Sequence, residues 1–431
     1  MRRYHHKLPT VTLAVGGFTA ITRLLRCALH AAGADIRSEE SSVSDALSAA
    51  PSLDKSSDKP SDQDPREQQT PARDAMLVEQ TMFEVKRVIV GQDRMIERML
   101  VCLLAKGHVL IEGVPGIAKT LAVETLARTV GGSFARLQFT PDLVPADIVG
   151  TRVYRQGSER FDTELGPVFA NFVLTDEINR APAKVQSALL EVMAEQQVSI
   201  GGRTYPVPLP FLVLATQNPI ESEGVYPLPE AQRDRFLMKI VVDYPSTEEE
   251  REIVYRMGVD PPVPQQVLDP DALLRLQAAS NRVFVHHALV DYVVRVVVST
   301  RRPAEHGMTD VAGWVSYGAS PRASLGMIAA ARALALLRGR DYVLPQDVLD
   351  IAPDVLRHRL VLSYDALADG VPLEHIVKRI LQTVPLPQVT PRQRTGGFAP
   401  GYPGPHVPGS PAPGHSYPMP PGAAQAGSRP A

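Results

Sequence analysis

The sequence has little cysteine and no marked excess of charge of either sign. Its 431 residues include two cysteines, Cys27 and Cys102, which lie far apart, so we expect neither a disulfide framework nor a cysteine-based metal site. Low cysteine content suits a reducing compartment, and we expect a cytoplasmic protein. A formal net charge of −2, without a dense block of lysine and arginine, argues against non-specific binding of nucleic acid as the main activity.

The sequence also lacks an apolar run long enough to cross a membrane. Residues 1–33 place basic residues before an apolar stretch, as a secretion signal does, but Arg23 and Arg26 interrupt that stretch. What remains is too short to span a bilayer, so we expect no transmembrane segment and no export signal. We interpret this part as a short helix, or as sequence translated upstream of a start near Met76.

The two ends of the chain have the composition of disordered segments. Residues 34–73 are rich in Ser, Asp, Lys and Pro, and they have too few large apolar side chains to offset the entropy of ordering. We therefore expect residues 1–75 to form a mostly disordered extension. Residues 385–431 are rich in Pro, Gly and Ala, and we expect a flexible or polyproline-like tail that acts as a spacer or docks a partner.

A short glycine-containing loop follows the apolar run at 108–112 and precedes an amphipathic segment. This order of strand, loop and helix is typical of a nucleotide phosphate cradle, in which backbone N–H groups and a helix N-terminus bind the phosphates. Lys119 would reach the β- and γ-phosphates and Thr120 would bind Mg²⁺; the alternative is a turn followed by a surface lysine. Besides Asp176, the residues expected to bind the nucleotide are Gly113, Val114, Pro115, Gly116, Ile117, Ala118, Lys119, Thr120 and Leu121.

One residue of this loop departs from the usual G-x-x-x-x-G-K-[ST] pattern. Ala118 stands where the pattern has glycine. A methyl group is tolerated at that place if the residue already has a helical, negative φ, so we keep the assignment.

Two adjacent acids, Asp176 and Glu177, end a second apolar run at 172–175. Burying their charge without a partner is costly, so the residues need either matching arginines or lysines or a Mg²⁺-bound nucleotide as counter-charge. We favour the nucleotide. Asp176 is then expected to hold the Mg²⁺, and Glu177 to orient and deprotonate the attacking water, because the chain turns at the strand end and both side chains can converge there.

Three later residues are candidates for sensing the γ-phosphate. Asn218 ends another apolar run and could hydrogen-bond the attacking water, although an asparagine here could simply cap a turn. Arg235 is the candidate arginine finger, acting on the nucleotide of a neighbouring subunit, with Arg233 as a rival and a surface ion pair as the alternative. Arg322 follows a proline that favours a helix start, and it could reach the γ-phosphate from a second domain.

The order of these motifs resembles the AAA+ superfamily and, within it, the MoxR family. The resemblance covers about residues 76–384, and Ala118 is similar to what MoxR members carry. The matching segments are Val90-Gly-Gln92, the loop from Gly113 to Thr120, Phe139-Thr-Pro-Asp142, Glu164-Leu-Gly-Pro-Val168, Asp176-Glu-Ile-Asn-Arg-Ala181, Ala215-Thr-Gln-Asn-Pro219, Tyr226-Pro-Leu-Pro-Glu230 and Asp234-Arg-Phe236. The resemblance implies an ATPase that assembles into a ring, expected to be a hexamer, and that works as a chaperone-like remodeller or metal-insertion factor. Such proteins are typically paired with a partner bearing a von Willebrand factor A domain.

The apolar pattern agrees with an α/β fold. Continuous apolar runs at 108–112, 172–175, 211–215 and 237–242 predict strands of a parallel sheet that is buried on both faces. Between them, apolar residues recur at helical spacing and predict helices on both faces of the sheet. The pattern thus agrees with what the resemblance implies, a P-loop AAA+ core over residues 76–245.

After the core the pattern becomes helical without buried strands, which predicts an all-α lid domain over residues 250–384. Nucleotide bound between core and lid would be contacted by Asn218 from one side and by Arg322 from the other. The predicted lid helices lie near 270–281, 286–301, 320–339, 345–357 and 371–383.

Two further segments of the core resemble insertions of one AAA+ branch. One spans about residues 136–166, and the other is a hairpin at about 196–208, where Gly201-Gly202 suits a two-residue turn. The resemblance places both toward a central pore, with Tyr154 and Phe161 as candidate contacts to a partner. The alternative is that both are ordinary surface loops.

We therefore expect an enzyme that hydrolyses ATP to ADP and phosphate and couples the reaction to conformational work on a partner protein. Its expected cofactor is Mg²⁺, and no direct contact with nucleic acid is expected. The alternatives are the ATPase subunit of a metal chelatase, a nucleic-acid motor or transcription activator on the same core, and a nucleotide switch that does not hydrolyse.

Overall fold

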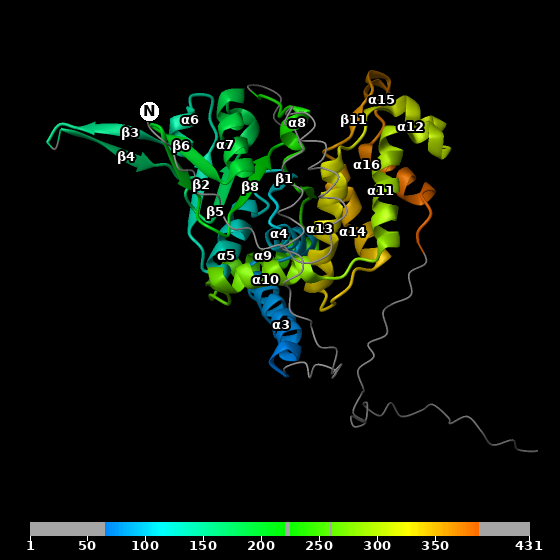
Figure 1. Cartoon of the computed structure of the whole chain (residues 1–431), viewed down its shortest axis with the longest axis horizontal. Coiled ribbons are helices and arrows are strands. Elements are labelled where there is room, and N and C mark those ends of the chain that lie inside the picture. Colours follow the sequence, from blue (N-terminus) through cyan, green and yellow to red (C-terminus); the bar gives the residue numbers. More distant parts are fainter. Residues whose placement is uncertain (1–64, 158, 220–224, 259–260, 388–431) are drawn as a thin grey trace, which may run out of the picture. The chain divides into compact units, whose positions relative to one another are not determined.

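A five-stranded sheet forms the centre of the described part of the chain (Figure 1). The computed structural model describes residues 65–157, 159–219, 225–258 and 261–387, all within the unit Asp64–Ala431. The expectations for residues 1–33, for 34–64 and for the tail from 388 onward lie outside these residues. The strands run parallel in the order β2-β5-β8-β1-β9. They are β1 (Val109–Gly113), β2 (Phe134–Gln138), β5 (Phe172–Asp176), β8 (Leu212–Gln217) and β9 (Met238–Val242).

Strand β1 shows why the central strands are continuously apolar. Val109 and Ile111 pack into one hydrophobic cluster, whereas Leu110, between them, packs into a second cluster. Successive side chains of a strand point to opposite faces, so a strand covered on both faces needs an apolar residue at every position. The four strands predicted from such runs are confirmed as β1, β5, β8 and β9.

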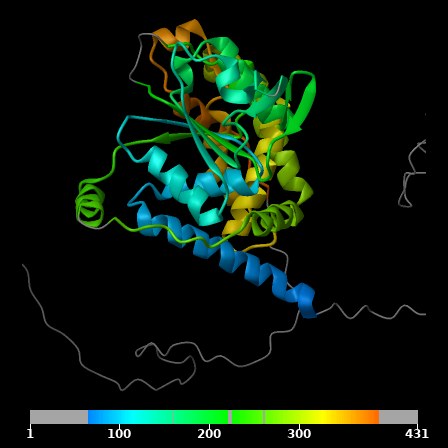
Figure 2. The ribbon, with the colours of Figure 1, turned by 90° about the vertical axis from the view of Figure 1, so that its left-hand side faces the viewer.

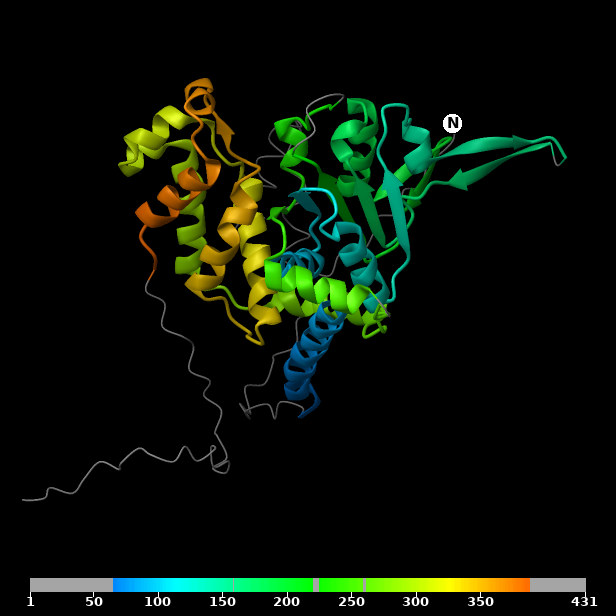
Figure 3. The same ribbon diagram turned by 180° about the vertical axis from the view of Figure 1, so that it is seen from behind.

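The sequence analysis missed strand β2, and the predicted insertion therefore starts too early. The burial of β2 is mixed, because it is an edge strand with one neighbour, and Arg136 and Gln138 interrupt its apolar residues. Residues 136–138 belong to the central sheet, where they pair with β5. The segment that leaves the sheet consists of α6 (Pro145–Val149) and the antiparallel hairpin of β3 (Gly150–Arg155) and β4 (Arg160–Leu165), which extends away from the sheet (Figures 1 and 3).

The second predicted hairpin is present. Strands β6 (Gln197–Ile200) and β7 (Arg203–Pro206) pair in an antiparallel manner across Gly201 and Gly202. Both glycines have positive φ, 57° and 81°, as a tight turn between two strands requires.

Helices cover both faces of the sheet. Within the described residues, no helix combines the length and the apolar character needed to cross a membrane. Helix α3 lies beside α5 and beside α10 (Pro270–Arg282) (Figure 2). The helices of this part are α3 (Pro65–Val88), α4 (Asp93–Leu104), α5 (Lys119–Val130), α7 (Ala183–Glu195), α8 (Glu230–Arg233) and α9 (Thr247–Met257), with a 3-10 turn, η1 (Ile178–Arg180).

Helix α3 begins at Pro65, inside the segment 34–73 that the sequence analysis predicted to be disordered. The prediction was wrong for residues 65–73 because it relied on the scarcity of apolar residues. Proline is favourable in the first turn of a helix, and the following Glu, Gln, Ala and Arg residues are good helix formers. They extend a helix that is anchored further along by buried residues such as Val78 and Val85.

The lid is helical, as predicted, and each of the five predicted helices is confirmed within a few residues. The pattern missed two short α-helices, a 3-10 turn and a small pair of strands, β10 (Val315–Tyr317) and β11 (Val361–Leu362), all of which are too short to show a period. The lid elements are α10 (Pro270–Arg282), α11 (His287–Arg301), η2 (Pro303–His306), α12 (Thr309–Trp314), α13 (Pro321–Leu337), α14 (Pro345–Leu356), α15 (Tyr364–Ala368) and α16 (Leu373–Thr383).

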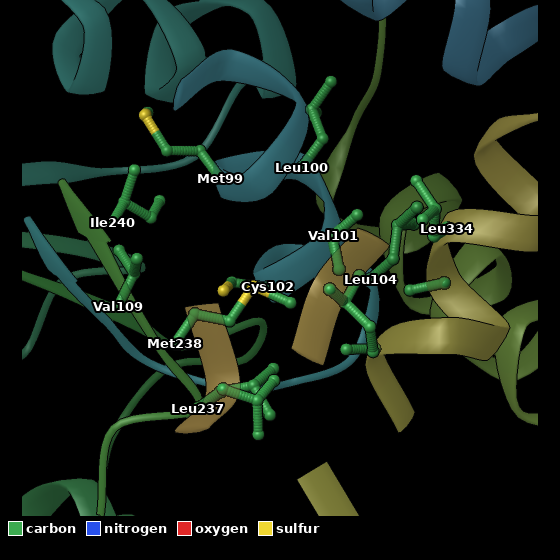
Figure 4. Packing of buried hydrophobic residues seen from close by; sticks show 14 of the residues in the cluster. Met99, Leu100, Val101, Cys102, Leu104, Val109, Leu237, Met238, Ile240 and Leu334 are labelled. Atoms are coloured by element: carbon green, nitrogen blue, oxygen red, sulfur yellow. The ribbon is translucent and has the colours of Figure 1, made fainter. Parts of the chain in front are cut away.

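Core and lid share one hydrophobic cluster. Figure 4 shows Val101 and Leu104 of α4 beside Leu334 of α13, and all three are buried. A buried ion pair adds to this contact: Arg98 of α4, 1% exposed, donates to Asp354 of α14 at 2.9 Å. Breaking such a pair leaves an uncompensated buried charge, so the junction between α4 and α14 resists separation.

We predict that the buried residue His108 makes stability depend on pH. Its Nδ1 accepts from Val213 N–H at 3.0 Å and its Nε2 lies 3.2 Å from Met193 O, which fits a neutral ring. Burial lowers the pKa of His108 from 6.5 to about 4, so the unfolded chain binds the proton more readily. The contribution, about 3 kcal/mol in free energy of unfolding, is fully present above pH 6.5 and is lost as the pH falls toward 4.

Urea unfolding of the wild type and of His108→Asn between pH 4 and 7.5 checks this. The variant should show a shallower loss of stability on acidification. His375→Asn, which changes an exposed histidine, is the matched control. Equal slopes for all three proteins would contradict the assignment to His108.

Candidate nucleotide-binding site

The predicted phosphate loop connects β1 to α5 at the carboxyl edge of the sheet. Gly116 has a φ of 84°, and helix α5 begins at Lys119. The Lys119 ammonium donates to Gly113 O at 2.5 Å and so lies across the loop. Burial lowers the pKa of Lys119, and the carboxylates of Asp176, Glu177 and Glu112 oppose this effect, which places the acids within electrostatic reach of the lysine.

Ala118 does not have the negative φ under which the sequence analysis considered its methyl group tolerable. Its φ is 61° and its ψ is 24°, the left-handed conformation. When residues of right-handed and left-handed conformation alternate along a loop, successive N–H groups point toward one place. The concavity that forms in this way binds anions. Glycine is usual at this place because it adopts this conformation without strain, whereas Ala118 carries a methyl group that disfavours it.

We predict that Ala118→Gly stabilises the protein by about 0.5–1 kcal/mol. Relief of left-handed strain contributes about 1–2 kcal/mol, and the greater freedom of glycine in the unfolded chain offsets part of it. The measurement is the urea concentration at the midpoint of unfolding, compared between proteins whose free energy of unfolding depends on urea with the same slope. The matched control is Ala127→Gly inside α5, which should cost about 1 kcal/mol or more. A midpoint lower than that of the wild type would contradict the claim that the backbone of Ala118 is strained.

Asp176 lies at the end of β5, where its carboxylate is 7% exposed and contacts three side chains. Oδ2 accepts from Thr120 Oγ1 at 3.4 Å and from Arg136 Nε at 2.7 Å, and Oδ1 accepts from Thr216 Oγ1 at 3.2 Å. The sequence analysis assigned the counter-charge to a nucleotide alone. The structure adds Arg136 from the strand that was missed, so an arginine partner and a phosphate-loop hydroxyl both face this carboxylate.

Glu177 follows the strand with a φ of 56°, and this left-handed turn brings its carboxylate back over the sheet edge. Its N–H donates to Thr216 Oγ1 at 3.0 Å. Its carboxylate accepts from Gln138 Nε2 at 2.8 Å and pairs with Arg180 Nε at 3.0 Å. Non-glycine residues in this conformation are strained and occur often at functional sites. The structure thus gathers Lys119, Thr120, Asp176 and Glu177 at one edge of the sheet.

The three candidate sensors occupy different places. Asn218, 9% exposed, is the first residue after β8, the neighbour of β5 in the sheet. Arg235 is exposed and donates to Leu190 O of α7 at 3.1 Å. Arg322 stands in the first turn of α13, as predicted, and its guanidinium lies 3.5 Å from a carboxylate oxygen of Asp234.

An apolar pocket of about 240 Å³ adjoins the phosphate loop. The sequence analysis did not identify it, because its walls come from three separated segments, and the third of these, with Pro245, Ile253 and Met257, gave no signal. Its size and its apolar walls suit a flat base beside the phosphates. The lining residues are Val88, Ile89, Val90, Gln92, Gly116, Ile117, Ala118, Leu121, Pro245, Ile253 and Met257.

A larger pocket, of about 580 Å³, lies on the lid between α14 and α16 and contains none of the phosphate-loop residues. Size alone therefore does not identify the functional site. The smaller pocket does, because it shares Gly116 and Ala118 with the loop that carries Lys119 and leads into helix α5.

A parallel sheet with a phosphate loop, two acids at its carboxyl edge and a helical lid defines the AAA+ class of P-loop proteins. Family models agree: the ATPase family associated with various cellular activities (AAA) matches residues 108–238, and an AAA lid domain matches residues 307–380. The chain is 70% identical over 329 residues to Chaperone MoxR1 of Mycobacterium tuberculosis, which covers 76% of this chain and 87% of that protein.

Two further relatives cover most of the chain. The protein YeaC of Bacillus subtilis is 41% identical over 313 residues, which is 72% of this chain and 95% of YeaC. A solved structure from Cytophaga hutchinsonii, named as a candidate ATPase, superposes with a TM-score of 0.72 at 45% identity, over 75% of this chain and 98% of that one. The chain belongs to the MoxR family of AAA+ ATPases.

Proposed function

We propose that the protein hydrolyses ATP to ADP and phosphate and uses the reaction for conformational work on a partner protein. The observation that carries this proposal is the group formed by Lys119, Thr120, Asp176 and Glu177 at the sheet edge. A lysine, a hydroxyl and two acids beside an amide-lined loop are the groups that phosphoryl transfer to water needs. The name of the relative MoxR1, a chaperone, supports a protein as the target of the work.

Each residue has a role that follows from its place. The amides of the phosphate loop and Lys119 bind and orient the β- and γ-phosphates, and the apolar pocket holds the base. Thr120 and Asp176 would hold Mg²⁺, Asp176 through the water shell of the ion, and the bound ion would neutralise charge on the phosphates. Glu177 accepts the proton of the attacking water, and Asn218 orients that water.

The remaining positive charge comes from arginines. Arg235, exposed on its own subunit, acts on the nucleotide of a neighbour, and Arg322 acts from the lid of the same subunit. This arrangement requires a ring, which we propose to be hexameric. We further propose that the protein acts in the cytoplasm with a partner bearing a von Willebrand factor A domain, in remodelling, maturation or metal insertion.

The β3–β4 hairpin is the proposed contact to the remodelled protein. The rings of Tyr154 and Phe161 pair across it at 5.1 Å, and both are exposed, at 49% and 59%. The Arg152 guanidinium lies 4.9 Å from the Phe161 ring centre, which adds a cation–π contact. Tyr205 of β7 bonds Thr163 at 3.2 Å and ties the two hairpins together.

The test uses Glu177→Gln loaded with ATP and Mg²⁺ as a trap, because this variant should bind ATP without completing the reaction. The proposal expects a protein to be retained on the trap, and retention should fall when Tyr154 and Phe161 are both changed to serine. Retention of nucleic acid, with hydrolysis by the wild type stimulated by DNA, would favour the motor alternative. A Lys119→Ala trap that retains the same protein would show that binding needs no nucleotide.

A further inference from the structure

A single guanidinium from the lid holds the segment that carries Arg235. Arg359 follows α14, and its side chain is 3% exposed. Its N–H groups donate to Asp234 O at 3.3 Å, to Phe236 O at 2.5 Å and to Leu237 O at 3.0 Å. One planar guanidinium therefore fixes three backbone carbonyls that flank Arg235. In this way a lid residue sets the direction in which the Arg235 side chain leaves the backbone.

The same arginine binds the side chain next to the candidate finger. Asp234 Oδ1 accepts from Arg359 Nε at 2.8 Å, and Oδ2 accepts from Ser320 Oγ at 2.8 Å. The Arg322 guanidinium lies 3.5 Å from Oδ2. The side chain of Asp234 is 16% exposed, so its charge is compensated mainly by these three lid groups. Charge-assisted bonds of this kind are about twice as strong as neutral ones.

The lid side of this contact is itself fixed. Ser320 is the N-cap of α13 and accepts from the Arg322 N–H at 3.1 Å. The preceding residue, Ala319, donates to Thr300 Oγ1 at 2.9 Å, and its carbonyl accepts from Arg301 Nε at 2.6 Å. The start of α13 is therefore bonded both to α11 and to Asp234, and it cannot shift without disturbing one of them.

We propose that Asp234 is a positioning residue that, through Arg359 and Ser320, fixes Arg235 and couples it to Arg322. The inference rests on the proposed function and deepens it. The Arg322 guanidinium contacts the same carboxylate, so the lid arginine proposed to meet the γ-phosphate and the proposed finger are both linked to Asp234.

The experiment uses mixed assemblies. A donor subunit, Lys119→Ala, keeps Arg235 but cannot bind ATP, and an acceptor subunit, Arg235→Ala, binds ATP but has no finger. Asp234→Asn is then added to the donor alone, with Glu230→Gln in the donor as the matched control, since Glu230 pairs at the surface of the same short helix. Turnover should fall about ten- to hundredfold with Asp234→Asn at unchanged KM, because ATP is bound by the unaltered site of the acceptor.

The outcomes separate the two proposals. If the wild type is active and the Asp234→Asn donor restores as much turnover as the Glu230→Gln donor, the inference is overturned and the proposed function is not. A wild type that hydrolyses no ATP overturns the proposed function, and the inference with it. If Asp234→Asn lowers the melting temperature so far that the donor does not assemble, Arg359→Lys carries the test, because lysine keeps the charge but cannot reach Asp234 and the carbonyls together. Full rescue by that donor overturns the inference.

Discussion

Changing Arg235 to alanine is expected to lower the turnover of an assembly built only from this variant by about 10³- to 10⁵-fold. The guanidinium is exposed and rests on α7 through Leu190 O, so it is available to the nucleotide of a neighbour. In the transition state it would stabilise charge on the phosphoryl oxygens, which explains the size of the effect. The measurement is the steady-state release of phosphate, with ATP affinity measured separately and expected to change little.

Two further proteins sharpen this result. Mixing Arg235→Ala with Lys119→Ala should restore turnover, because the second variant still donates its arginine, and no recovery would argue against action between subunits. Arg233→Ala tests the rival finger. Arg233 pairs with Glu230 at 3.4 Å, and we expect its replacement to have a small effect. A loss larger than that of Arg235→Ala would transfer the role to Arg233.

The Glu177→Gln variant is expected to retain ATP binding and to lose about 10²- to 10⁴-fold in turnover. Glutamine keeps the shape of the side chain and can still contact Gln138 and Arg180, but it cannot accept a proton. Single-turnover kinetics would measure the chemical step, and titration with a fluorescent nucleotide would measure binding. The control is Glu195→Gln, an exposed glutamate at the end of α7.

Two results would contradict the assignment of Glu177 as the base. Full turnover by Glu177→Gln would show that another group activates the water. A parallel loss of ATP binding would show that the residue supports the site structurally, through its left-handed backbone and its contact with Thr216.

Local motifs could be predicted from the sequence, and contacts between distant segments could not. The phosphate loop, Asp176 and Glu177 each follow a continuous apolar run, and strands buried on both faces produce such runs. Arg136 was missed because its strand lies at the sheet edge, where polar side chains interrupt a short pattern. The contact between Arg359 and Asp234 spans 125 positions, and no spacing rule relates them.

The backbone conformation of individual residues also could not be predicted from the sequence. The sequence showed that Ala118 replaces a glycine, and a negative φ was the condition under which alanine would be tolerated. The structure shows the left-handed conformation at this place, with alanine present. Lid helices were predicted well because proline and glycine mark their ends, whereas the one-turn helices α12 and α15 are too short for a period to appear.

The central claim is that ATP and Mg²⁺ bind beside Lys119 in a form ready for hydrolysis. Isothermal titration calorimetry of the purified protein with ATP and Mg²⁺ tests it most directly, with Lys119→Ala as the comparison. The account predicts saturable binding by the wild type and a marked loss of affinity in the variant. Absence of any heat of binding for adenine nucleotides, in a wild type shown to be folded, would contradict it.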